Sequence, residues 1–144
     1  MEIPMPVTTQ SKIIQASLEA TWDKLGNFHD LSWAPNVVTS CDVVGPIDGH
    51  NVGAKRVLNG VFHETLTEAD QDTYSLKYSI DDGPSPVSKQ EVSNYIGAIK
   101  LSPAEDGATL VEWNSSWQSN TADAVDFCQG IYVALLDELA ASFR

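Results

Sequence analysis

The sequence is poor in basic residues and histidines, and each shortage excludes a class of function. It has 8 Lys and Arg against 20 Asp and Glu, which gives a formal net charge of −12. Because nucleic acids and anionic membranes both require a cationic patch, and no basic cluster occurs, neither is expected as a partner. The three histidines have no metal-ligand spacing, and no glycine-rich phosphate loop is present. We therefore expect no metal and no cofactor.

Cysteines and long apolar runs are also scarce. The two cysteines, Cys41 and Cys128, lie far apart and outside any CxxC pair. Two reduced thiols are the simpler expectation, and a single long-range disulfide is the alternative. The first ten residues resemble no signal peptide, and no stretch approaches the roughly 18 apolar residues of a membrane span. We therefore predict a cytoplasmic protein without membrane insertion, either a monomer or a homodimer.

The remaining sequence is ordinary for a folded protein and predicts a definite order of elements. Its 144 residues, 42% of them hydrophobic, suit one domain covering residues 1–144. Ser17 suits the N-cap of a helix at Leu18–Leu25. A second short helix is expected at residues 28–32, before Trp33-Ala34-Pro35, and a long helix at 121–143. Alternating apolar residues predict strands at Val7–Ile14 and at residues 37–44, 54–58, 61–69, 73–80, 92–101 and 108–118.

This order indicates an α+β fold in which one antiparallel sheet covers one long helix. The terminal helix is the only element long enough to cover the sheet, and it carries an apolar stripe at Phe127, Ile131, Leu135 and Leu139. A curved sheet that wraps around one helix leaves a tapered space, which is a natural ligand pocket. The apolar and aromatic candidates for its wall are Trp33, Phe62, Tyr78, Phe127, Ile131 and Leu135.

Two charged residues flank a predicted turn at Asn59-Gly60. Glu64 shares a strand face with Phe62 and Leu66, so alternation carries it toward the interior. The direction of Arg56 depends on the turn. A two-residue loop at Asn59-Gly60 would place Arg56 opposite His63 on the outer face.

A three-residue loop at 58–60, with Gly60 at positive φ, would instead turn Arg56 inward. Arg56 would then oppose Phe62 and share the inner face with Glu64. We favour this second arrangement. The last strand is also ambiguous, because Glu112 lies on one face and Trp113 and Trp117 on the other. Composition alone turns the tryptophans inward.

Several short motifs carry a resemblance that covers nearly the whole chain. A pattern W-x2-L-x2-F-x2-L-x-W-x-P runs from Trp22 to Pro35, and Cys41 precedes a Val-Val-Gly. Gly53-Ala54-Lys55-Arg56, Glu64-Thr65-Leu66, Ser93-Asn94-Tyr95 and Val111-Glu112-Trp113 follow in order. In this order the sequence resembles the polyketide cyclase/dehydrase branch of the START/Bet v 1-like superfamily. The resemblance implies a helix-grip fold: a curved seven-stranded antiparallel sheet around the C-terminal helix, with two short helices after the first strand.

Two relatives in this superfamily sharpen what the resemblance implies about function. Plant lachrymatory factor synthases have a similar order of motifs, and the likeness assigns proton transfer to Arg56, Glu64 and Tyr95. Plant abscisic-acid receptors are similar around Tyr95 and Glu112, which implies that these two residues face the pocket and Trp113 does not. The sequence lacks the receptors' gating-loop motifs and pocket lysine.

We therefore predict a protein that binds a small hydrophobic or amphipathic molecule. Its polar head would meet Arg56, Glu64, Tyr95 and Glu112. The alternative is a cofactor-free acid/base enzyme, of the cyclase, dehydratase or isomerase type, in which Glu64 carries the proton and Arg56 stabilises negative charge.

Overall fold

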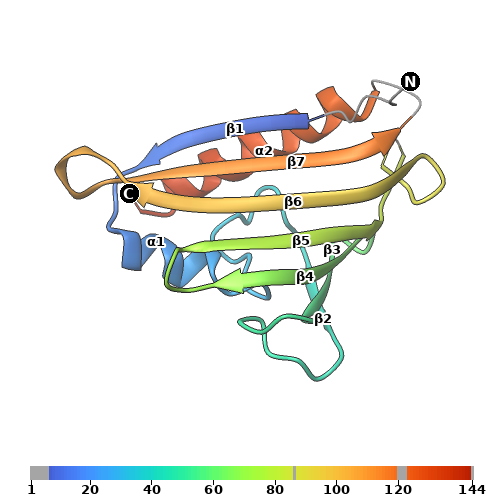
Figure 1. The fold of residues 1–144 in the computed structure, drawn as a ribbon, viewed down its shortest axis with the longest axis horizontal. Coiled ribbons are helices and arrows are strands. Elements are labelled where there is room, and N and C mark those ends of the chain that lie inside the picture. The colour runs from blue at the N-terminus through green and yellow to red at the C-terminus, as the bar shows by residue number, and fades with distance from the viewer. Residues whose placement is uncertain (1–6, 86, 120–122, 144) are drawn as a thin grey trace.

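The fold is a single curved antiparallel sheet with a long helix along its inner face (Figure 1). The computed structural model describes residues 7–85, 87–119 and 123–143. The seven strands lie in the order β1-β7-β6-β5-β4-β3-β2. Their bounds are β1 Val7–Ile14, β2 Cys41–Val44, β3 Lys55–Leu58, β4 Phe62–Asp70, β5 Ser75–Asp82, β6 Val92–Pro103 and β7 Thr109–Ser119. Helix α1 spans Leu18–Leu25, a 3-10 turn spans Glu105–Gly107, and α2 spans Asp123–Ala141.

Helix α2 contacts β1 and lies behind β1 and β7 in Figure 1. Its buried face includes the predicted Leu135 and Leu139. Phe127 and Ile131 are only half-buried, because the helix is rotated so that Cys128 and Tyr132 face the sheet. The predicted stripe is therefore correct in its C-terminal half and one position off in its N-terminal half. The first two residues of the predicted helix at 121–143 lie outside the described residues.

Helix α1 forms as predicted, whereas the expected second short helix does not. The Ser17 side chain accepts a hydrogen bond from the Ala20 amide at 3.1 Å and caps α1. Residues 27–38 form successive turns instead of a helix. The cause is local, because the Asp30 carboxylate accepts hydrogen bonds from the Ser32 amide at 3.0 Å and from its hydroxyl at 2.6 Å. Such side-chain bonds compete with helical ones.

The β3–β4 hairpin decides the direction of Arg56. Its loop is Asn59-Gly60-Val61, with φ of 54° at Asn59 and 71° at Gly60. Leu58 pairs with Phe62, and Arg56 therefore stands directly opposite Glu64. The prediction that both charges face inward is confirmed, as is the positive φ of Gly60. The predicted loop at 58–60 is wrong by one residue.

Contacts from outside the hairpin explain that difference. The Oδ1 atom of Asn59 accepts hydrogen bonds from the amides of Thr39 at 2.7 Å and Ser40 at 3.3 Å. Asn tolerates the left-handed region better than most residues, so these bonds hold Asn59 in the loop. The two positive φ values turn the chain, and Val61 is the extra residue before β4.

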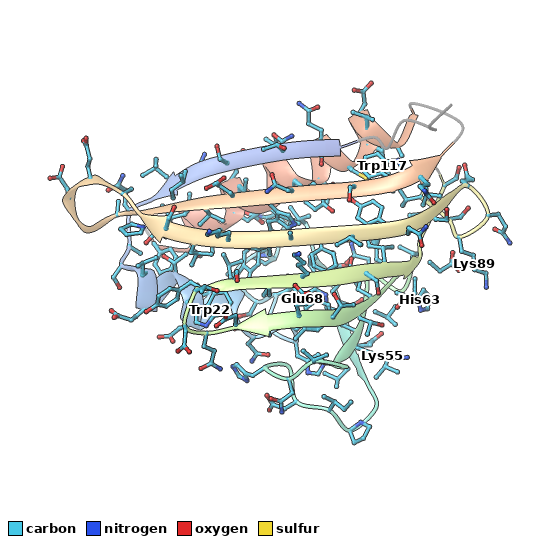
Figure 2. All side chains as sticks on the ribbon, in the orientation of Figure 1. Trp22, Lys55, His63, Glu68, Lys89 and Trp117 are labelled. Carbon is cyan, nitrogen blue, oxygen red and sulfur yellow. The ribbon has the colours of Figure 1, made fainter. Side chains whose placement is uncertain are left out.

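The faces of the sheet alternate as expected for a half-buried surface. On β7 the residues Val111, Trp113, Ser115 and Trp117 are buried. On the opposite face the side chains are more exposed, and Figure 2 shows Lys55 and His63 on that outer side. Trp113 is only 2% exposed, so composition predicted the direction of β7 correctly.

Candidate functional site

A cavity of about 120 Å³ lies between the inner face of the sheet and α2. The turns after α1 close one side through Leu31, Val37 and Val38, and α2 supplies another wall. Most of the wall is apolar or aromatic. The full lining consists of Leu31, Val37, Val38, Arg56, Leu58, Asn59, Phe62, Glu64, Tyr78, Ile80, Val87, Tyr95, Trp113, Cys128, Ile131, Tyr132 and Leu135.

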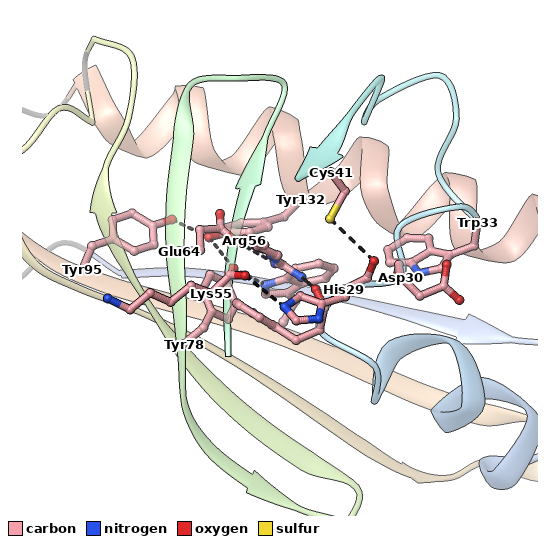
Figure 3. A network of polar contacts seen from close by, with 12 residues as sticks. His29, Asp30, Trp33, Cys41, Lys55, Arg56, Glu64, Tyr78, Tyr95 and Tyr132 are labelled. Carbon is pink, nitrogen blue, oxygen red and sulfur yellow. Dashed lines mark hydrogen bonds and ion pairs between the residues drawn. The ribbon is translucent and has the colours of Figure 1, made fainter. Parts of the chain in front are cut away.

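The charges in this wall come from one buried ion pair on adjacent strands (Figure 3). Arg56 on β3 is 7% exposed and Glu64 on β4 is 5% exposed. The Nε and Nη2 atoms of Arg56 contact the same carboxylate oxygen, Glu64 Oε1, at 2.8 and 2.6 Å. Among the described residues, the other oxygen, Oε2, takes part in no hydrogen bond. One carboxylate oxygen therefore keeps its capacity for a ligand.

The guanidinium of Arg56 is held on three sides. Its Nη1 atom donates a hydrogen bond to the carbonyl oxygen of Phe28 at 2.8 Å. The guanidinium carbon lies 3.7 Å from the centre of the Phe28 ring and 5.5 Å from that of the Tyr78 ring. These contacts replace part of the hydration that the cation loses, through hydrogen bonding and cation–π attraction. Arg56 is therefore a fixed positive charge at the cavity wall.

Burial controls the protonation of Glu64. Loss of water around the carboxylate raises the pKa of Glu64, while the neighbouring Arg56 charge and hydrogen bond oppose part of that rise. A carboxyl group with a raised pKa exchanges its proton at a pH closer to neutrality than an exposed one. The arrangement can thus bind a polar ligand group or accept a proton from it.

A chain of hydroxyl groups runs along the wall beside the ion pair. The Trp113 Nε1–H group donates to the Tyr78 hydroxyl at 3.0 Å, and the hydroxyls of Tyr78 and Tyr132 lie 3.1 Å apart. The Tyr132 hydroxyl is also hydrogen-bonded to that of Tyr95, which lies 3.3 Å from Cys128 Sγ. Burial raises the pKa of all three tyrosines and of Cys128. These groups therefore stay protonated at neutral pH.

Seven of the ten residues predicted to contact a ligand line the cavity. Their role in ligand binding stays a prediction. They are Arg56, Phe62, Glu64, Tyr78, Tyr95, Ile131 and Leu135. Trp33 lies in a separate small cavity, where its Nε1 atom donates to the carbonyl of Asp30 at 2.9 Å. Phe127 stacks on Phe62, with ring centres 6.4 Å apart, outside the lining.

The expectation that Glu112 faces the cavity is wrong. Glu112 pairs with Ser11 on one side and Lys100 on the other, on the outer face of β7. Alternation along a strand allows only one of two neighbours to face inward, and the large apolar surface of Trp113 takes that place. The register implied by the abscisic-acid receptors does not apply to this strand.

Tyr132 and Cys128 are cavity residues that sequence reasoning missed. Both lie one position after residues of the predicted stripe on α2, and both are 4% exposed. Their signal was present, since Ala124, Cys128, Tyr132 and Leu136 also recur at four-residue spacing. Which of the two adjacent stripes faces the sheet is decided by the rotation of α2 about its axis, and the sequence alone does not give that rotation.

The described residues contain neither a cluster of possible metal ligands nor a helix that could cross a membrane. No group of three or more His, Cys, Asp or Glu side chains is gathered in residues 7–85, 87–119 and 123–143. Neither described helix is long and apolar enough to cross a membrane. Cys41 and Cys128 are both free thiols, as the simpler of the two sequence expectations had it.

Comparisons with solved structures support the fold over almost the full chain. A protein from Nitrosospira multiformis has a TM-score of 0.94 and 43% identity, over 96% of this chain and 97% of that one. An uncharacterised protein from Bacillus thuringiensis has a TM-score of 0.79 and 27% identity, over 96% and 98%. Ginseng major latex-like protein 151, from Panax ginseng, shares the fold at a TM-score of 0.77 and 13% identity, over 95% and 96%. A search of curated proteins finds no match.

The sequence also matches a family profile over residues 5–144. The description of that family is polyketide cyclase / dehydrase and lipid transport. The matched range includes every strand and helix of the fold and both members of the buried ion pair. Together with the seven-stranded sheet around α2, this match confirms the resemblance that the motifs suggested. The chain belongs to the polyketide cyclase / dehydrase and lipid transport family.

Proposed function

We propose that this protein binds a small amphipathic molecule in the cavity between the sheet and α2. The observation that carries the proposal is the Arg56–Glu64 ion pair, buried in a wall that is otherwise mostly apolar. Removing two charges from water is costly, and a buried ion pair is often no more stable than apolar residues of the same size. Its retention at a cavity is therefore better explained by ligand recognition than by stability.

The size of the cavity limits the part of the ligand that fits without rearrangement. Its volume of about 120 Å³ is slightly smaller than a cavity of about 150 Å³ that holds benzene. A ring of five or six atoms is therefore the largest rigid group expected to fit. A longer ligand would extend between Val37, Asn59 and Ile131, which line the same cavity.

Thermal unfolding with a panel of small cyclic compounds tests this proposal. A ligand at 100 times its Kd stabilises the folded protein by about 2.7 kcal/mol, which is readily measured as a rise in Tm. Ile131→Phe fills the cavity and should abolish the rise. Val133→Phe is the matched control, because Val133 is 43% exposed on the same helix. A panel without any stabilising compound would contradict the proposal.

A second candidate function is acid/base catalysis without a cofactor. It is favoured by the raised pKa of Glu64 and by the absence, among the described residues, of a hydrogen bond to Oε2. In an isomerisation, the Glu64 carboxylate would take a proton from a carbon next to a carbonyl. Arg56 would stabilise the enolate oxygen, and Glu64 would return the proton to another carbon.

The predicted third participant, Tyr95, has its hydroxyl engaged with Tyr132 and Cys128. The ring centre of Tyr78 lies 5.5 Å from the Arg56 guanidinium carbon, and the Tyr78 hydroxyl can donate to a substrate when Tyr132 donates to it. Once a substrate is found, Glu64→Gln should abolish turnover and leave ligand binding within a few-fold of wild type. Unchanged turnover would exclude Glu64 as the proton carrier.

The net charge and the two thiols bear on the expected partners and location of the protein. The net charge of −12 supports the prediction that nucleic acids are not partners. The two free thiols support the prediction of a cytoplasmic location, where cysteines stay reduced.

A further inference from the structure

The hydroxyl chain along the cavity wall contains one more hydrogen than it has hydrogen bonds. Its five groups are Trp113, Tyr78, Tyr132, Tyr95 and Cys128, and four contacts join them in that order. Each group carries one N–H, O–H or S–H hydrogen. Five hydrogens in four contacts leave one over. The indole of Trp113 only donates, so its hydrogen always goes to Tyr78.

The position of the surplus hydrogen decides what Tyr78 offers to the cavity. If every bond points toward Cys128, the thiol hydrogen is free, and the Tyr78 oxygen keeps one lone pair for a ligand. If every bond points toward Tyr78, the thiol donates to Tyr95 and the Tyr78 hydroxyl hydrogen is free for a ligand. The two states differ only by rotation about C–O and C–S bonds. No proton leaves its atom.

The energies of the two states are close, because sulfur is both a weak donor and a weak acceptor. When the direction of the chain reverses, a weak hydrogen bond from the Tyr95 hydroxyl to the Cys128 sulfur is replaced by a weak hydrogen bond from the Cys128 thiol to the Tyr95 oxygen. Tyr78, Tyr95 and Tyr132 are at most 4% exposed, so bulk water has little access to their hydrogens. All five groups line the cavity, which places both ends of the chain at its wall.

We propose that the hydroxyl chain reverses with the ligand, so that Tyr78 donates a hydrogen bond to a carbonyl and accepts one from a hydroxyl or N–H group. The site would then take both a carbonyl compound and the enol or alcohol related to it at one position. Cys128 is a positioning residue in this scheme, because it acts on the ligand through Tyr95 and Tyr132. The inference rests on the proposed function, since it requires a ligand in this cavity.

Three five-membered rings separate the two directions of the chain. Cyclopentanone only accepts, pyrrole only donates from its N–H group, and cyclopentane does neither. Wild type should bind cyclopentanone and pyrrole more tightly than cyclopentane, as measured by NMR titration. Tyr78→Phe should lower both affinities about fivefold relative to cyclopentane, the value of one net hydrogen bond.

Cys128→Ala and Cys128→Ser form the decisive pair of variants. Alanine removes the acceptor at the end of the chain, so the Tyr95 hydroxyl should donate to Tyr132, and Tyr132 should then donate to Tyr78. The ratio of cyclopentanone to pyrrole affinity should rise about fivefold in Cys128→Ala. Serine both donates and accepts, so Cys128→Ser should keep the wild-type ratio. Equal ratios in the two variants would overturn the inference.

The thiol itself gives a second readout that does not depend on affinity. Cyclopentanone should shift the infrared S–H stretch of Cys128 to lower frequency, since the thiol then donates to Tyr95. Pyrrole should shift it the other way, and Cys128→Ser identifies the band against that of Cys41. An identical band with both rings would overturn the inference while leaving ligand binding intact. If none of the three rings binds, the proposed function fails and the inference fails with it.

Discussion

Replacing Arg56 with methionine tests the buried ion pair most directly. Methionine has an unbranched, flexible side chain without a charge, so the change leaves the Glu64 carboxylate buried without its partner. Breaking a buried pair in this way costs about 3–5 kcal/mol, whereas an exposed pair contributes about 1 kcal/mol or less. With exposures of 7% for Arg56 and 5% for Glu64, we expect the larger loss. Domains have about 5–15 kcal/mol of stability, so the variant should still fold.

The loss should depend on pH in a direction set by Glu64. Folding raises the pKa of Glu64. The stability that Glu64 contributes is therefore fully present at pH values below its pKa in the unfolded chain, and it is lost as the pH rises through its pKa in the folded protein. Without Arg56 nothing opposes the effect of burial, and the rise becomes larger. Arg56→Met should therefore regain stability on acidification toward pH of about 4.3, by about 1.4 kcal/mol for each unit of added pKa shift.

Urea unfolding, followed by tryptophan fluorescence between neutral pH and pH of about 4.3, measures both effects. The double variant Arg56→Met/Glu64→Leu is the control, because it removes both charges: it should be close to wild type in stability at neutral pH and should not gain stability on acidification as Arg56→Met does. A loss below about 1 kcal/mol at neutral pH in Arg56→Met would refute the reasoning, since it would equal that of an exposed pair. A loss that does not shrink on acidification would show that the Glu64 charge is not its cause.

Four further predictions concern single residues near the pair and elsewhere in the fold. A Cβ at position 97 would lie within 3.0 Å of the Tyr78 ring and hydroxyl, so Gly97→Ala should destabilise the protein by about 1–3 kcal/mol in urea unfolding. Gly130→Ala, in helix α2 with open space around it, should instead stabilise it by about 0.5–1 kcal/mol. Asn59→Ala removes the acceptor for the Thr39 and Ser40 amides and should cost about 1–3 kcal/mol by the same measurement, whereas Asn59→Asp keeps that acceptor and should cost less. Glu112→Gln on the outer face should leave stability within about 0.5 kcal/mol and ligand affinity unchanged in an NMR titration, and a clear loss of affinity would restore Glu112 to the site.

Local sequence is sufficient to predict most of the fold because each element carries its own signal. Alternation predicts the strands, Ser17 predicts the start of α1, and the parity of β4 turns Glu64 inward. It fails at residues 28–32, where Phe28 and Leu31 have the spacing of a helix but the chain forms turns stabilised by Asp30. The competing hydrogen bonds of a single carboxylate outweigh the helix preference of five residues.

The geometry of the site depends on contacts between elements that are distant in the sequence. The loop at Asn59 is held by Thr39 and Ser40, which come from a different segment, and a loop shorter by one residue would place Arg56 opposite His63 on the outer face. The rotation of α2 selects Cys128 and Tyr132 over their neighbours and so assembles the hydroxyl chain. Strand parity and helix period are properties of neighbouring residues, so they can be read along the chain. The register of a hairpin and the rotation of a helix follow from packing against distant residues, so only the tertiary structure decides them.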